Sequence, residues 1–188
     1  KEGKEYLDVL SRQSLRLKKL IDDLMEMSKA STGSMSVNIT PLDLTESINQ
    51  ALGEFSDKLE KENLQVIFRQ PEHPIAIQAD GRLTWRVLSN LLGNAVKYAM
   101  AGTRVYVDVV PRGRKVEISV KNISARPLNI SAEELMERFV RGDSSRHTEG
   151  SGLGLSIAKS LTQLQYGTFD IAIDGDLFKA TLTFPKIP

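Results

Sequence analysis

Cysteine is absent from this chain, and in 188 residues tryptophan occurs once and histidine twice. Without cysteine the protein has neither a disulfide framework nor a cysteine-ligated metal site. No apolar run approaches the roughly 18 residues that a membrane-spanning helix needs. The formal net charge of +1 leaves no excess of positive charge for binding nucleic acid or an acidic membrane surface.

What the chain does contain is typical of a globular protein, with 40% hydrophobic and 26% charged residues. A chain of this length can form one well-buried domain with an appendage. It begins at Lys1 rather than at a methionine, so we expect a piece of a longer protein.

Residues 4–30 carry an apolar seam that alternates by four and three positions, which predicts one long helix. The seam positions are Leu10, Ser14, Leu17, Ile21, Leu24 and Ser28. Such a seam needs a partner helix, so we expect a homodimer or a missing partner; the alternative is a helix that packs on its own domain. A linker follows, and we expect two units, residues 1–33 and 34–188.

The rest of the chain alternates between helix-like and strand-like patterns. We expect helices at 45–61, after an Asp80 cap, from Ser131 with Glu134 in a capping box, and after the glycines near residue 150. Strands are expected at 65–69, 75–79, 104–110, 115–121, 168–173 and 177–184. This order predicts an α+β fold, a two-layer α/β sandwich whose mixed, mostly antiparallel sheet carries helices on one face.

Residues 90–98 place four polar side chains on one face of a predicted helix. Asn90, Asn94, Lys97 and Tyr98 follow the helical period, while leucines occupy the opposite arc. An amide oxygen is a suitable ligand for Mg²⁺, and a lysine can neutralise phosphate. The alternative is a solvent-exposed helix face with no binding or catalytic function.

A second motif consists of three alternating glycines, Gly150, Gly152 and Gly154, directly before an apolar-periodic helix. Glycine lets the backbone approach a ligand closely, and a helix N-terminus offers N–H donors to an anion. The alternative is a glycine hinge. The spacing fits neither a Walker A loop nor a dinucleotide-binding fingerprint.

In this order the two motifs resemble the N box and G2 box of the ATP-binding domain of sensor histidine kinases. Residues 137–146 between them resemble the F box of that family. The resemblance covers nearly the whole chain, and it implies ATP and Mg²⁺ as cofactors. It also identifies the N-terminal helix as the second helix of the dimerisation hairpin.

The resemblance implies roles for individual residues. Asn94 would be the Mg²⁺ ligand, Asn90 would support it one turn earlier, and Arg141 would reach the γ-phosphate. Lys97 and Tyr98 would contact phosphate and nucleotide. The lid around the triphosphate would be made by Gly150, Ser151, Gly152, Leu153 and Gly154.

Asn90 also bears on the reaction type. Related gyrase-like ATPases place a glutamate at this position to activate water, whereas an amide cannot act as a general base near neutral pH. We therefore expect phosphoryl transfer to a protein acceptor, as in a protein-histidine kinase, rather than efficient hydrolysis.

Asn122 stands where the family has the aspartate that accepts a hydrogen bond from adenine, and the two glycines that usually follow are missing. Its amide oxygen can still accept, although a charge-assisted bond is roughly twice as strong as a neutral one. We expect ATP binding, weaker than is typical. The alternative is a degenerate, nucleotide-free adaptor module.

Neither histidine, His73 or His147, has the sequence context of a phosphoacceptor. The acceptor histidine is therefore expected upstream in the full protein, with relay to the receiver domain of a response regulator. We expect this part of the protein to lie on the cytoplasmic side of the cell membrane, with anchoring only through segments absent from this sequence. We expect no nucleic-acid partner. A serine-directed kinase of the same fold is the remaining enzyme alternative.

Overall fold

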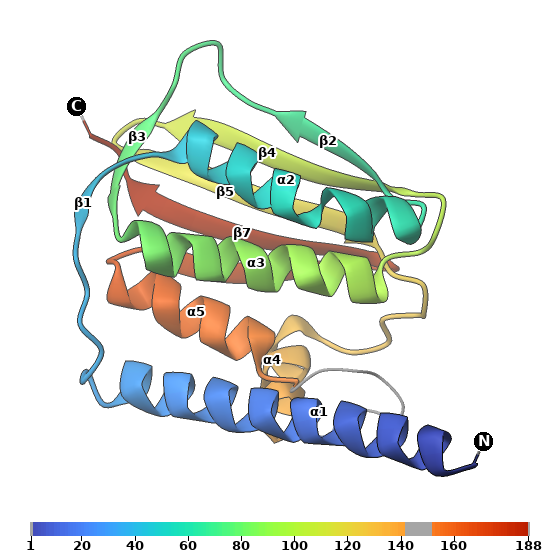
Figure 1. Ribbon diagram of the computed structural model, residues 1–188. Helices are drawn as coiled ribbons and strands as arrows, with labels where there is room; N and C mark the ends of the chain where they lie inside the picture. Colours follow the sequence, from blue (N-terminus) through green and yellow to red (C-terminus); the bar gives the residue numbers. More distant parts are fainter. Residues whose placement is uncertain (1, 142–151, 188) are drawn as a thin grey trace.

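The computed structural model describes residues 2–141 and 152–187 (Figure 1). Its helices are α1 (Glu2–Ser31), α2 (Leu44–Lys61), α3 (Gly81–Tyr98), α4 (Ala132–Arg141) and α5 (Gly154–Leu164). Its strands are β1 (Thr40–Asp43), β2 (Gln65–Arg69), β3 (Ala76–Ala79), β4 (Arg104–Arg112), β5 (Lys115–Ile123), β6 (Thr168–Asp174) and β7 (Leu177–Pro185). The helix predicted at residues 4–30 is confirmed.

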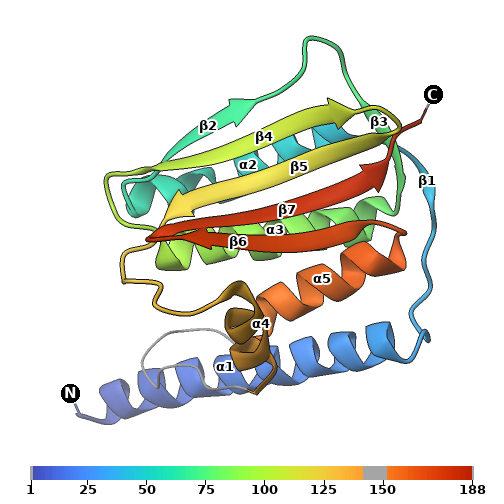
Figure 2. The ribbon, with the colours of Figure 1, turned by 180° about the vertical axis from the view of Figure 1, so that it is seen from behind.

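Five strands form one sheet in the order β2-β4-β5-β7-β6, in which only β2 and β4 run parallel. The helices α2, α3 and α5 cover one face, and the view from behind shows the other face uncovered (Figure 2). The predicted α+β two-layer sandwich is therefore confirmed. The predicted strands at 65–69 and 75–79 belong to different sheets, because β3 pairs with β1.

Alternation along the strands explains why the sheet holds its helices. In β5, Val116, Ile118 and Val120 are buried against the helical layer. On the side of the helical layer that faces the sheet, Leu88 and Leu91 of α3 are each 2% exposed. Burying such a side chain contributes about 1.5–3 kcal/mol, so this contact fixes α3 on the sheet and turns its polar stripe away from the core.

The N-terminus of α3 is capped as the sequence predicts. Asp80 Oδ1 accepts hydrogen bonds from the backbone N–H groups of Arg82 (3.0 Å) and Leu83 (3.2 Å). Fully buried Gln165, just after α5, accepts from the backbone N–H of Asp80 (2.8 Å) and the hydroxyl of Thr84 (3.0 Å). These bonds fix α5 against the start of α3.

The predicted capping box of α4 is also present. Ser131 Oγ accepts from the backbone N–H of Glu134 at 3.1 Å, and Glu134 Oε2 accepts from the backbone N–H of Ser131 at 3.3 Å. Two otherwise unpaired N–H groups are satisfied in this way.

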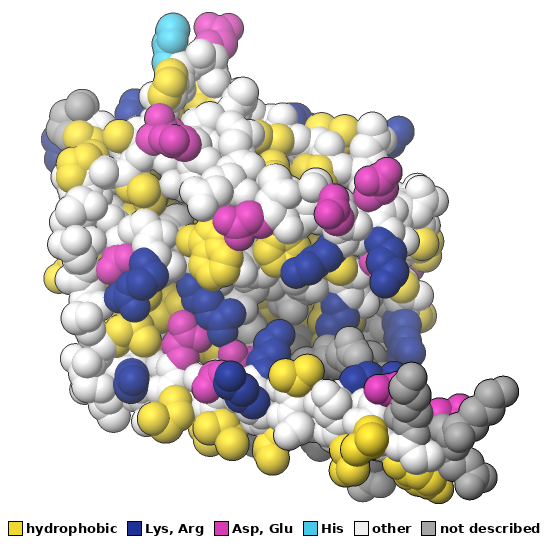
Figure 3. All heavy atoms as spheres, in the orientation of Figure 1, with side chains coloured by type: hydrophobic (Ala, Val, Ile, Leu, Met, Phe, Trp, Pro, Cys, Tyr) yellow, Lys and Arg dark blue, Asp and Glu magenta, His cyan; other side chains and the backbone are white. Residues whose placement is uncertain are grey.

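The long helix α1 packs along α5 on one side (Figure 1). Asp23 and Ala30 are buried, whereas Leu17, Ile21 and Leu24 are more than half exposed. Hydrophobic side chains accordingly line the lower edge of the molecule in Figure 3, over α1. The helix thus packs on its own domain, as the alternative interpretation expects, and its pairing with a second helix stays a prediction. Within the described residues, every helix is too short or too polar to cross a bilayer.

Candidate functional site

The polar stripe predicted for residues 90–98 lies on α3. Asn90, Asn94, Lys97 and Tyr98 are each partly buried, between the fully buried face and the solvent. Lys97 Nζ stands 4.7 Å from the centroid of the Tyr98 ring, a cation–π contact that orders both side chains. The stripe thus presents two amides and one ammonium group on a helix that the core holds in place.

The first residue of α5 meets this stripe. A Cβ atom added to Gly154 would lie 3.8 Å from Oδ1 of Asn90 and 3.8 Å from Oδ1 of Asn94. The structure therefore brings together the two motifs that are far apart in the sequence. Glycine keeps the space between the backbone of α5 and the two amides open, whereas a longer side chain would fill it.

The start of α5 offers backbone donors at the same place. Gly152 has φ +73°, a left-handed conformation that glycine adopts readily. Leu153 occupies the N-cap position, where its apolar side chain makes no capping hydrogen bond. The side chain at the N-cap therefore pairs with none of the first N–H groups of α5, and a helix N-terminus favours an anionic ligand.

One amide nitrogen of the stripe has no hydrogen-bond partner among the described residues. Nδ2 of Asn90 is buried and forms no hydrogen bond with the part of the chain that the structure describes. A buried donor without a partner costs about 1–3 kcal/mol. Because this donor belongs to one of the two amides beside Gly154, a polar ligand at this site would offset the cost.

The donor set also bears on a metal. Across residues 2–141 and 152–187, no group of three histidine, aspartate or glutamate side chains could hold an ion. A divalent cation beside Gly154 would therefore depend on the amide oxygen of Asn94 and on oxygens of its own ligand. Hard oxygen donors of this kind suit Mg²⁺, which usually binds through few protein ligands and substrate phosphates.

Asn122 lies beneath the C-terminal end of α3. It is 5% exposed and stands on the helix-facing side of β5, in line with Val116, Ile118 and Val120. The backbone N–H of Met100 donates to the carbonyl of Ile123 at 2.8 Å, and that of Ala125 donates to the carbonyl of Tyr98 at 2.8 Å. These bonds tie the end of α3 to the residues after Asn122.

Four residues from the sequence analysis are described only in part or lie outside the described residues. Gly150 and Ser151 fall outside the described residues, and so does His147. Arg141 is the last residue of α4, where only its backbone is described. His73 is exposed in a loop between β2 and β3.

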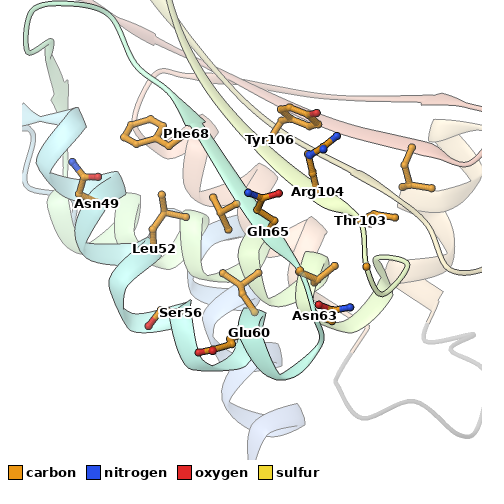
Figure 4. Close-up of a pocket in the computed structure, with 15 residues that line it drawn as sticks. Asn49, Leu52, Ser56, Glu60, Asn63, Gln65, Phe68, Thr103, Arg104 and Tyr106 are labelled. Carbon is orange, nitrogen blue, oxygen red and sulfur yellow. The ribbon is translucent and has the colours of Figure 1, made fainter.

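A hollow of about 1050 Å³ lies elsewhere, between α2 and strands β2 and β4 (Figure 4). Its lining combines apolar side chains such as Leu52 and Phe68 with polar ones such as Asn49 and Arg104. It follows the edge of the sheet opposite to β6. Asn90, Asn94 and Gly154 take no part in it, so it does not mark the predicted site.

Sequence reasoning missed Arg86, which lies one turn before Asn90 on α3. Its guanidinium pairs with Asp23 and Glu26 of α1, at 2.8 Å and 2.9 Å. The spacing of four residues before Asn90 was the available signal. The acidic partners could not be found, because nothing local in the sequence relates α1 to α3.

Comparison with known proteins agrees with this geometry. A family model described as histidine kinase-, DNA gyrase B-, and HSP90-like ATPase matches residues 79–187, more than half of the chain. Drug sensory protein A of Synechocystis sp. is 31% identical over 174 residues, which cover 85% of this chain and 26% of that protein. The chain spans 26–39% of the length of such curated relatives.

Solved structures show the same fold. The catalytic domain of histidine kinase ThkA superposes with a TM-score of 0.68 at 25% identity, covering 79% of this chain and 96% of that one. ThkA in complex with response regulator protein TrrA superposes with a TM-score of 0.76 at 22% identity, covering 98% and 52%. The chain therefore belongs to the family of histidine kinase-, DNA gyrase B- and HSP90-like ATPases and carries the ATP-binding domain of a sensor histidine kinase.

Proposed function

We propose that this chain binds ATP with Mg²⁺ between the polar stripe of α3 and the first turn of α5, and that it transfers the γ-phosphate to a protein histidine. The observation that carries the site is the meeting of Gly154 with Asn90 and Asn94. Family membership supports ATP as the nucleotide.

In this proposal each element contributes one kind of contact. The amide oxygen of Asn94 holds Mg²⁺, which when bound neutralises phosphate charge. The ammonium group of Lys97 attracts phosphate, and Tyr98 contacts the nucleotide. The N–H groups at the start of α5 donate to phosphate oxygens. The side chain of Arg141 and the remaining lid residues, Gly150 and Ser151, keep the roles that the resemblance implies.

The base is proposed to lie toward Asn122. This residue faces the helical layer beneath the end of α3, so its amide can accept a hydrogen bond from the amino group of adenine. Because the acceptor is neutral, the bond is weaker than one to a carboxylate.

Asn90 favours transfer to a protein over hydrolysis. An amide does not take up a proton near neutral pH, so it cannot activate water. We propose that the phosphoacceptor is a histidine outside this sequence and that the phosphoryl group passes on to a response regulator. The solved complex of ThkA with TrrA shows such an assembly for that protein.

The exposed seam of α1 supports a homodimer in the whole protein. Leu10, Leu17, Ile21 and Leu24 are 65%, 58%, 53% and 61% exposed. A row of exposed apolar side chains at coiled-coil spacing is typical of a helix that pairs with another.

Titration with a non-hydrolysable ATP analogue, with and without Mg²⁺, tests the proposal. The native chain should bind in a Mg²⁺-dependent manner. Asn94→Ala should weaken binding at least about tenfold and remove the Mg²⁺ dependence, whereas Gln50→Ala on α2 serves as the matched control. Unchanged affinity and metal response in Asn94→Ala would contradict the site, and absence of binding by the native chain would support the adaptor alternative.

A further inference from the structure

The helix α1 is held on the rest of the molecule by a narrow stripe. Asp23 and Ala30 are 3% and 7% exposed, and Met27 packs against the core between them. The apolar seam faces elsewhere and stays exposed. The apolar contact of α1 with the domain is thus small, and its only deeply buried charged group is a carboxylate among the described side chains of this helix.

That carboxylate is matched by one arginine of α3. Arg86 Nη2 donates to Asp23 Oδ1 at 2.8 Å, and Arg86 Nε donates to Glu26 Oε2 at 2.9 Å. The side chains of Arg86 and Asp23 are 27% and 5% exposed. Burial lowers the pKa of Arg86, but Glu26 and Asp23 more than reverse this, so its pKa lies above the ordinary value. The charge of Arg86 offsets the cost of burying this carboxylate, so the ion pair contributes to the docking of α1.

The same arginine lies one turn before the polar stripe of α3 that carries the proposed nucleotide site. Arg86, Asn90 and Asn94 follow one another at intervals of four residues on α3. Side chains at this spacing are neighbours on a helix surface, with Cβ atoms about 5–6 Å apart. A guanidinium group binds phosphate and carboxylate with the same fork of donors. The guanidinium of Arg86 can therefore pair either with a carboxylate or with a phosphate bound beside Asn90.

We propose that Arg86 is a positioning residue that alternates between two anionic partners, the carboxylates of Asp23 and Glu26 and the terminal phosphate of a nucleotide held at Asn90 and Asn94. This inference rests on the proposed function. With α1 docked, the two carboxylates hold the guanidinium. With ATP bound, the γ-phosphate competes for it and favours the release of α1. ADP lacks that phosphate and competes less.

The exchange makes a reciprocal coupling between nucleotide and helix. If the γ-phosphate weakens the docking of α1 by a given factor, then the release of α1 must strengthen the binding of ATP by that same factor. The coupling is selective for ATP over ADP, and it vanishes when residue 86 carries no charge. If Arg86 had a purely structural role, its replacement would change the affinities for ATP and ADP by the same factor.

The test is a set of affinities for ATP and ADP, measured by competition against a fluorescent nucleotide. Asp23→Asn with Glu26→Gln should tighten ATP binding about fivefold to tenfold with little change for ADP. In an Arg86→Gln background the same two changes should leave the ratio of the two affinities unaltered. Arg86→Lys should retain part of the effect, because it keeps the charge.

Controls separate folding from coupling. Arg82→Gln, one turn earlier on α3 with a side chain that is 66% exposed, removes the same charge without touching α1 and should leave both affinities unchanged. Glu26→Gln alone is the milder variant and should shift the ratio in the same direction, and thermal unfolding verifies each variant. An unaltered ratio in the doubly neutralised variant, or the same shift in the Arg86→Gln background, would overturn the inference alone. Failure of the native chain to bind either nucleotide would overturn the proposed function as well.

Discussion

Asn122 is the residue whose chemistry bears most directly on base selection. It is buried on the helix-facing side of β5 and carries no charge. Asn122→Asp would offer a carboxylate to the amino group of adenine, whereas guanine presents an acceptor at that position. We expect the ratio of ATP to GTP affinity to rise about threefold to tenfold. Competition binding of the two nucleotides measures this, and a constant or falling ratio would argue against a base near Asn122.

Asp108 on the uncovered face of the sheet makes stability depend on pH. Burial raises the pKa of Asp108, but hydrogen bonds from Arg69 and Lys121 outweigh it, so its pKa lies below the ordinary value. The distances from Asp108 Oδ2 are 2.8 Å to Arg69 Nη2 and 2.6 Å to Lys121 Nζ. A lowered pKa adds stability that is present above the unfolded value, about 4, and is lost as pH falls through the folded pKa.

Asp108→Asn should therefore lower the free energy of unfolding at pH 7 by about 1 kcal/mol, since Arg69 is partly screened by solvent. The deficit should shrink as pH falls below about 4. Urea unfolding of both proteins at several pH values measures it, with Asp170→Asn on the same face as the control. A deficit of equal size at pH 7 and at low pH would refute the linkage.

Among the elements, the turn after α5 stores strain that a substitution can remove. Tyr166 has φ +61° and is 81% exposed, so its side chain packs little. We expect Tyr166→Gly to raise the free energy of unfolding by about 0.5–1 kcal/mol, because glycine adopts this conformation without the Cβ penalty.

The neighbouring residue provides the contrast. A Cβ atom on Gly167 would lie 2.7 Å from the carbonyl oxygen of Thr183 and 2.8 Å from Cγ2 of Thr162. Gly167→Ala should therefore destabilise the protein by at least about 1 kcal/mol. Thermal unfolding compares the two variants, and a loss of stability in Tyr166→Gly similar to that in Gly167→Ala would show that the strain argument is wrong.

The elements also show how far local pattern reaches. The polar stripe of α3 and the caps at Asp80 and Ser131 could be predicted, because each depends on residues two to eight positions apart. The parallel pairing of β2 with β4 could not, because it brings together strands that the whole of α3 separates. The contact of Gly154 with Asn90 and Asn94 was expected only from family resemblance, since no periodicity relates residues of different helices.

At the scale of the whole molecule, α1 uses two faces for two tasks. Its buried stripe packs on the domain through Asp23, Met27 and Ala30, and its exposed seam is available for a second helix. The sequence showed the seam clearly because seams are periodic. It did not show the docking stripe, where a buried carboxylate pairs with Arg86 of a distant helix.

The central claim is that nucleotide binds where α5 meets the stripe of α3. Nuclear magnetic resonance of the backbone and side-chain amides during titration with Mg²⁺ and a non-hydrolysable ATP analogue tests it most directly. We predict that the signals of the side-chain amides of Asn90 and Asn94 and of the backbone amide of Gly154 shift, while those of Asn49 and Asn63 in the hollow beside α2 do not. Shifts confined to the hollow, with the stripe unaffected, would contradict it.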